Sequence, residues 1–201
     1  AGVLASFFFL FIPFNIYFSR VILPEPLAVC LGLLSLLTFV SFIDSGKNWK
    51  LYLSGIILSL AVLVKPFVLF YSLPMLYLII DKYGLKNILR KAGLLVKFVV
   101  FAILVLFPFF LWRSWINNFP EGIPFWKWAF NGDKIRFMPS FWRWIFGERI
   151  GHLILGGWGL VPLVFGLAAK SKNYFDKIFF LGALVYLSLI ATANVRHDYY
   201  Q

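Results

Sequence analysis

Long apolar runs constrain the fold of this chain more than any other feature. The runs 24–43 and 94–112 are each close to the about 20 residues with which a helix crosses a hydrocarbon core of about 30 Å. Only 13% of the 201 residues are charged, against roughly 25% in an average soluble domain. The sequence therefore predicts an integral membrane protein of the all-α class.

The order of the apolar runs predicts a polytopic transmembrane helical bundle of about seven spans, the first of them truncated. The expected segments are 1–14, 24–43, 51–64, 67–80, 94–112, 151–169 and 178–194. The pair Lys65-Pro66 leaves two interpretations open for the third and fourth segments. They are either one long kinked helix or two short spans joined by a tight turn.

The distribution of positive charge favours the turn. If the chain reverses at Lys65-Pro66, three short basic loops fall on one side of the membrane: 44–50, 81–91 and 170–177. Basic loops mark the cytoplasmic side. This topology predicts a multi-pass membrane protein with these loops in the cytoplasm, and we expect its location to be the plasma membrane. It also explains the net charge of +11 without nucleic acid, because the cations form short clusters between apolar runs rather than one patch.

The long loop 113–150 would then lie on the outer side of the membrane. It is rich in tryptophan and in cations, for example in the stretches 125–128 (FWKW) and 141–146 (FWRWIF). Aromatic rings combined with long cationic side chains are typical of helices that lie in the headgroup region. We therefore predict interfacial helices here. They would form either a plain aromatic belt or a lid or groove for a lipid substrate.

Several polar residues that are far apart in sequence fall on the outer side in this topology. Arginine binds phosphate oxygens bidentately and lysine binds them as a point charge. Such a cluster suits the phosphate of a membrane-bound carrier lipid. Simpler roles remain open, because Arg20 and Lys65 could snorkel to the interface and Glu25 could pair with Arg20 or favour a helix N-terminus. The predicted set is Arg20, Glu25, Lys65, Arg196, His197 and Asp198.

Other kinds of chemistry find less support in the sequence. The single cysteine, Cys30, allows no disulfide within the chain and no cysteine-based metal site. His152 stands alone near the start of a span and is interpreted as structural. We find no glycine-rich phosphate loop, no G-x-S-x-G, and no His/Glu pair at metal-ligand spacing on one helix. No cofactor is called for, although a divalent metal held by Glu25 and His197 is one candidate.

Three segments together resemble a known family. Residues 19–27 (SRVILPEPL) are similar to the "SR-x-I-L-x-(D/E)-P-x-L" segment of the GT-C membrane glycosyltransferases, which include the protein O-mannosyltransferases and the aminoarabinose transferases acting on lipid A. Residues 55–66 (GIILSLAVLVKP) resemble the family's "G-x3-G-L-A-x-L-x-K" segment, with Ser59 where a second glycine is usual. Residues 196–201 (RHDYYQ) resemble its "R-H-x-Y-Y" motif.

The resemblance implies a hexosyl- or pentosyltransferase with a polyprenyl-phosphate sugar donor and a lipid, glycan or protein acceptor. The chemistry would take place at the extracytoplasmic face, among membrane lipids. Glu25 matches a supporting acidic position that places substrate or a metal. Lys65, Arg196 and His197 match positions suited to the lipid phosphate, and Tyr199 and Tyr200 complete the substrate-binding motif.

The beginning of the sequence predicts a larger protein. The chain opens within an apolar run and has no initiator methionine. We therefore expect residues 1–201 to be a single transmembrane domain, part of a longer chain whose N-terminal span and first outer loop lie upstream. In the family that loop carries the principal acid, so the general base is expected upstream of Ala1. A transporter or lipid flippase and a non-catalytic membrane subunit are the alternatives. The first would predict inverted repeats and charges near the midplane, which the sequence lacks.

Overall fold

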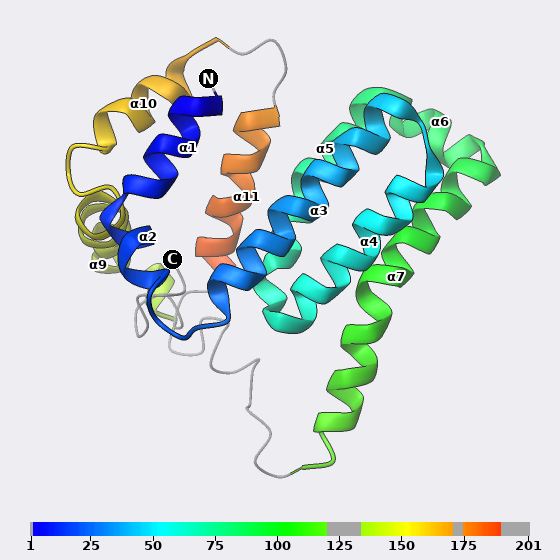
Figure 1. Cartoon of the computed structure of the whole chain (residues 1–201), viewed down its shortest axis with the longest axis horizontal. Coiled ribbons are helices and arrows are strands. Elements are labelled where there is room, and N and C mark those ends of the chain that lie inside the picture. The colour runs from blue at the N-terminus through cyan, green and yellow to red at the C-terminus, as the bar shows by residue number, and fades with distance from the viewer. Residues whose placement is uncertain (1, 120–133, 171–174, 190–201) are drawn as a thin grey trace. The chain divides into compact units, whose positions relative to one another are not determined.

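All secondary structure in the described part of the chain is helical. The computed structural model describes residues 2–119, 134–170 and 175–189 (Figure 1). These residues form two compact units. Unit 1 comprises Ala1–Pro26, Pro124–Lys172 and Leu184–Gln201, and unit 2 comprises Leu27–Ile123 and Asn173–Ala183. That residues 1–201 make one domain stays a prediction.

Unit 2 is built from long helices that run back and forth. Two of them, α3 and α7, are long and apolar enough to cross a membrane, while α4 is apolar but shorter. The unit also contains the first part of α11 (Phe175–Leu189). Its remaining elements in chain order are α3 (Glu25–Ser45), α4 (Asn48–Val64), η1 (Pro66–Tyr71), α5 (Ser72–Tyr83), α6 (Leu85–Arg90) and α7 (Ala92–Ile116).

Two buried serines join α3 to α4. The Ser35 hydroxyl donates to the Ser54 carbonyl oxygen at 2.8 Å, and the Ser54 hydroxyl donates to the Ser35 carbonyl oxygen at 2.9 Å. Both residues are fully buried. Lipid tails offer no hydrogen-bond partner, so hydroxyls between membrane helices bond across the helix interface. The short loop at 46–47 and this reciprocal pair fix α3 and α4 as an antiparallel hairpin.

Small residues allow the neighbouring helices of unit 2 to approach closely. A Cβ on Gly32 of α3 would lie 2.8 Å from side-chain atoms of both Val68 and Tyr71 in η1. A Cβ on Gly55 of α4 would lie 3.1 Å from the ring of Phe101 in α7. The hydrophobic core of unit 2 lies between these helices, and Phe39 is one of its fully buried residues. Close backbone approach at glycine is typical of helix packing in membranes.

The chain reverses direction at Lys65-Pro66. Helix α4 ends at Val64, and Lys65 is extended, with φ −148° and ψ 112°. Proline has no N–H and disfavours a helical conformation in the residue before it, so the helix stops here. After η1, α5 leads back toward the end of unit 2 where α6 and the start of α7 lie (Figure 1). Its end lies against the first part of α7, because the rings of Tyr83 and Phe98 are 5.7 Å apart. The structure thus has the turn and not the kinked helix.

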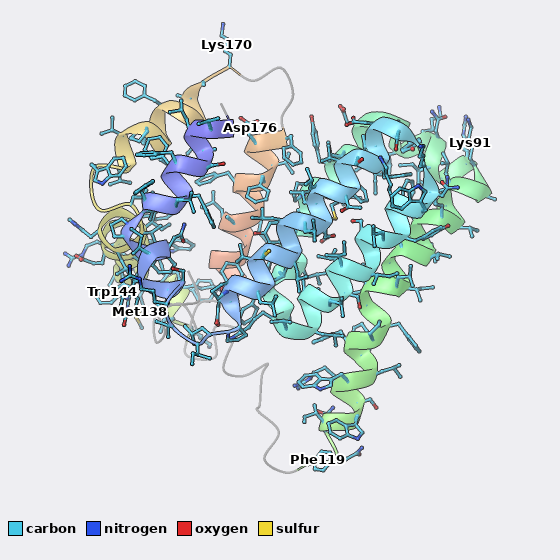
Figure 2. The ribbon with its side chains drawn as sticks, viewed as in Figure 1. Lys91, Phe119, Met138, Trp144, Lys170 and Asp176 are labelled. Carbon is cyan, nitrogen blue, oxygen red and sulfur yellow. The ribbon has the colours of Figure 1, made fainter. Side chains whose placement is uncertain are left out.

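This reversal gathers two basic loops at one end of unit 2. The loop between α3 and α4 carries Lys47, and the region from α5 to α7 carries Lys86 and Lys91. Figure 2 shows Lys91 at this end and Phe119, beyond the end of α7, at the other. Charge is therefore asymmetric along the unit, as the positive-inside argument requires.

Unit 1 consists of shorter helices around a small core. Phe141 and Ile145 are buried in it and pack against partly buried neighbours that include Trp142 and Tyr186. The Phe8 and Trp158 rings, 5.6 Å apart, pack against each other. The unit also holds the last part of α11. Its other helices are α1 (Gly2–Phe11), α2 (Pro13–Phe18), η2 (Ile135–Phe137), α9 (Pro139–Arg143), η3 (Trp144–Ile154) and α10 (Leu160–Ala168).

The predicted span over residues 151–169 is not one continuous helix. The sequence predicts a single helix over 151–169, but the structure divides it between η3 and α10. Gly156 and Gly157 between them have φ values of +61° and +76°, a left-handed conformation that side-chain-bearing residues rarely adopt and that ends a helix. The arrangement of seven spans is accordingly not confirmed by the described residues. Of the predicted interfacial helices, 141–146 is helical, and 125–128 lies outside the described residues.

Candidate functional site

Arg20 and Glu25 flank the entry into α3. Arg20 is exposed in the turn after α2, and its N–H donates to the Tyr17 carbonyl oxygen at 3.2 Å. Glu25 is the first residue of α3, and both of its carboxylate oxygens are shielded from solvent. A carboxylate in the first turn of a helix is stabilised by the helix dipole. The position of Glu25 at the start of α3 therefore stabilises its carboxylate within a very apolar sequence.

Lys65 occupies the chain reversal in unit 2. Its backbone N–H closes α4 by donating to the Ala61 carbonyl oxygen at 2.9 Å, and the residue is half-buried. Because α3 and α4 form an antiparallel hairpin, Lys65 lies at the same end of the unit as Leu27, away from the basic loops (Figure 1). Ser59, which departs from the family pattern, is buried in α4 at 6% exposure, as a packing position should be.

The remaining predicted site residues cannot be placed. Arg196, His197, Asp198, Tyr199 and Tyr200 all lie outside the described residues. Lys65 and Glu25 belong to different units, so the predicted convergence of the whole set stays a prediction.

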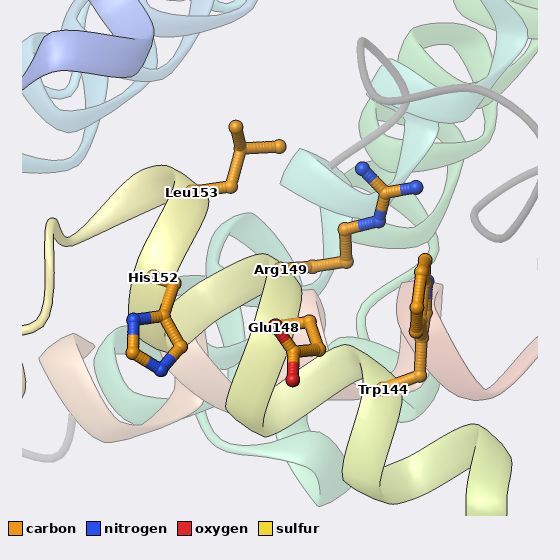
Figure 3. Close-up of a pocket in the computed structure, with 5 residues that line it drawn as sticks. All are labelled: Trp144, Glu148, Arg149, His152 and Leu153. Atoms are coloured by element: carbon orange, nitrogen blue, oxygen red, sulfur yellow. The ribbon is translucent and has the colours of Figure 1, made fainter.

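A pocket that the sequence did not predict lies in unit 1. It is an open depression of about 400 Å³ on one face of η3 (Figure 3). Its lining residues all come from that helix and are Trp144, Glu148, Arg149, His152 and Leu153. An aromatic ring, a carboxylate, a guanidinium and an imidazole thus share one small surface.

The π-helical geometry of η3 produces this grouping. The Leu155 N–H donates to the Ile150 carbonyl oxygen at 3.0 Å, five residues back, as in a π-helix. With that period, residues five apart stack, and the Arg149 guanidinium carbon lies 4.8 Å from the centroid of the Trp144 ring. A cation over the face of tryptophan is also held by its quadrupole.

Composition does not predict this pocket on η3, although the spacing of its residues does. Composition places Trp144 in an aromatic segment, and position alone makes His152 a structural residue at the start of a span. The signal lay in the spacing, because Trp144, Glu148 and His152 follow one another at intervals of four residues. Residues at this spacing share a helix face.

The same spacing overturns one prediction about metals. The sequence interpretation holds that no His/Glu pair occurs at metal-ligand spacing on one helix. Glu148 and His152 are four residues apart on η3, so that prediction is wrong. Among the described residues, however, no group of three or more His, Cys, Asp or Glu side chains is placed to hold a metal ion. A metal at Glu25 and His197 stays a prediction, since His197 is not described.

Comparison with known proteins supports the sequence motifs. Residues 1–90 match the family model described as dolichyl-phosphate-mannose-protein mannosyltransferase. The match covers both the 19–27 segment and the 55–66 segment. No curated protein and no solved structure matches the chain. The predicted resemblance to a GT-C, mannosyltransferase-like membrane glycosyltransferase is thus confirmed as a similarity over residues 1–90.

Proposed function

We propose that the protein transfers a sugar, in the first instance mannose, from a polyprenyl-phosphate carrier to an acceptor hydroxyl at the outer face of the plasma membrane. The observation that carries this proposal is the match of residues 1–90 to the mannosyltransferase family model. The placement of Glu25 and Lys65 adds support. Both lie at helix termini, Glu25 at the start of α3 and Lys65 at the end of α4.

In this mechanism the acceptor oxygen attacks the anomeric carbon of the sugar. The bond from that carbon to the phosphate oxygen breaks, and the carrier leaves as a lipid phosphate. A carboxylate accepts the acceptor proton, as in other general-base reactions. Attack from the side opposite the leaving phosphate inverts the anomeric centre.

The cations contribute by stabilising the charge that develops on the leaving phosphate. Lys65, with Arg20, Arg196 and His197, would take this role, because ammonium and guanidinium groups in a water-poor site stabilise such charge strongly. Glu25 would orient the donor sugar or a divalent metal, and Tyr199 and Tyr200 would contact the substrate. The shielding of the Glu25 oxygens suits such an orienting role, since a carboxylate kept from bulk water interacts more strongly with a bound ligand.

A transfer assay on the full-length protein tests these roles. Purified enzyme is given a panel of polyprenyl-phosphate sugars, and Lys65→Ala and Arg196→Ala are expected to lower the rate by about 10²–10³-fold. Glu25→Gln should cause a smaller loss. Lys86→Ala and Asp44→Asn, exposed residues near the basic loops, are the matched controls and should keep wild-type rates. Wild-type transfer by all three site variants would overturn the assignment.

The outer-face assignment has its own test. In a Cys30→Ser background, Ser19→Cys and Lys86→Cys each provide one exposed thiol. A membrane-impermeant maleimide applied to intact cells should label position 19, while position 86 should react only after permeabilisation. The reverse labelling would overturn the proposed orientation.

A further inference from the structure

We propose that the η3 face around Trp144 is a binding subsite for a neutral pyranose ring, an inference that rests on the proposed sugar transfer. The surface in question is the open pocket lined by Trp144, Glu148, Arg149, His152 and Leu153. It is an open depression of about 400 Å³ on one helix, so it would contact one face of a ring rather than enclose it.

The side chains offer the two kinds of contact that a sugar ring uses. Trp144 is 40% exposed, so its indole can pack against the apolar C–H face of a pyranose. Glu148 and Arg149 provide a charged acceptor and a charged donor for neighbouring hydroxyls, and such charge-assisted hydrogen bonds are the stronger ones. Figure 3 shows Arg149 beside the Trp144 ring and Glu148 between Trp144 and His152.

The Trp144–Arg149 contact restricts the conformations of both side chains in the absence of a ligand. The guanidinium carbon lies 4.8 Å from the ring centroid, which restricts both long side chains. A surface whose side chains are already ordered loses less entropy on binding. A tryptophan that serves only as a membrane anchor needs no such partner and no carboxylate beside it.

The charge of the pocket favours a neutral ligand over a phosphate. Within 134–152 the cations are Lys134, Arg136, Arg143 and Arg149, and Glu148 is the single acidic residue. That acid is located in the pocket, where its formal charge cancels that of Arg149. A phosphate would be repelled by the carboxylate, whereas sugar hydroxyls can donate to it.

Ligand-observed NMR on the detergent-solubilised full chain tests the subsite. The probes are the methyl glycosides of mannose, glucose and galactose, and at least one should bind the wild type. Trp144→Ala and Glu148→Gln should each weaken its Kd by about tenfold or more, since hydrogen bonds to a charged group and ring contacts are lost. The matched controls are Phe137→Ala and Arg136→Gln, which alter a similar cation–aromatic pair (5.2 Å) outside the pocket. They should change Kd less than twofold.

Three results would overturn the inference. The first is that no glycoside binds the wild type. The second is that binding is the same in both pocket variants. The third is that inorganic phosphate displaces the glycoside and loses this ability in Arg149→Gln, which would make the pocket an anion site.

Kinetics of sugar transfer identify the source of the ring. In Trp144→Ala, a raised KM for the acceptor with an unchanged KM for the donor assigns the subsite to an acceptor glycan, and the opposite pattern assigns it to the donor sugar. An unchanged KM for both substrates would refute a substrate subsite. Failure of the proposed function looks different, because the wild type itself would then transfer no sugar from any lipid-linked donor.

Discussion

The two units use their polar side chains in opposite ways. In unit 2, Ser35 and Ser54 turn their hydroxyls toward each other's backbone and are fully buried. In unit 1, Trp144 and Glu148 lie on an open surface of η3. Polar groups in the first case hold helices together, and in the second they are accessible to a ligand.

The hydrophobic cores of the two units also differ, in size. In unit 2 a continuous set of buried residues joins α3, α4, α5 and α7. Among the described residues of unit 1, Phe141 and Ile145 form a much smaller cluster. Binding and catalytic residues are commonly carried by less regular segments supported by a rigid scaffold. The larger core indicates that single core mutations cost more stability in unit 2 than in unit 1, and mutations in the two units should separate stability from glycoside binding.

The largest expected effect is loss of a buried ring from unit 2. Phe39 is fully buried and its ring lies 5.6 Å from that of Phe101. Phe39→Ala should lower the free energy of unfolding by about 3 kcal/mol, mostly through the cavity it leaves. Unfolding in mixed micelles measures this. Phe110→Ala removes a ring that is 59% exposed and serves as the control. Equal losses for the two variants would show that α3 and α7 are not packed as described.

The next effect comes from a glycine contact. Gly32→Val places a branched side chain where even a Cβ would be 2.8 Å from Tyr71 and Val68, so α3 must shift away from η1. Overpacking of this kind costs about 1–3 kcal/mol. Gly147→Val in unit 1 is the control, because a Cβ there meets nothing within 4 Å. If both variants unfold alike, the close approach of α3 to η1 does not contribute to stability.

A smaller effect is expected at the serine pair. Ser54→Ala removes the bond from its hydroxyl to the Ser35 carbonyl oxygen and the 3.0 Å contact between the two hydroxyls, and hydrogen bonds between membrane helices average about 0.6 kcal/mol. The double mutant with Ser35→Ala isolates the coupling, which should be about 0.5–1 kcal/mol. Thr38→Ala is the control, because its hydroxyl donates within its own helix, to Leu34, at 2.8 Å. Strict additivity of Ser35→Ala and Ser54→Ala would argue against their direct interaction.

Sequence patterns predicted unit 2 better than unit 1, and the reason is physical. Apolar length, Lys65-Pro66 and the positions of basic residues together determine where α3, α4, α5 and α7 begin and reverse. In unit 1 the outcome depends on Gly156-Gly157 and on a π-helical turn. Their effect is local, and apolar periodicity does not reveal it.

The candidate site residues likewise fall into a part that sequence motifs predict and a part that they do not. The roles of Glu25 and Lys65 came from short motifs in helices whose termini are well defined by proline. Composition marks the η3 segment only as an aromatic stretch, and the four-residue spacing within it is what indicates the pocket. Glu148, the one acid among the cations of 134–152, was the residue that spacing would have singled out.

The pocket itself provides the sharpest test of the comparison, because there the change in binding should exceed the change in stability. Trp144→Ala removes a partly exposed ring and its contact with Arg149. An exposed cation–π pair is worth about 0.5–1 kcal/mol. The buried part of the indole adds to this, so the unfolding free energy should fall by more than that but by less than in Phe39→Ala, whose ring is fully buried. Glycoside binding in the same variant should fall by about tenfold or more. A loss of stability as large as that of Phe39→Ala would mean that Trp144 is part of the core of unit 1, and the contrast between buried residues that stabilise and open residues that bind would then fail.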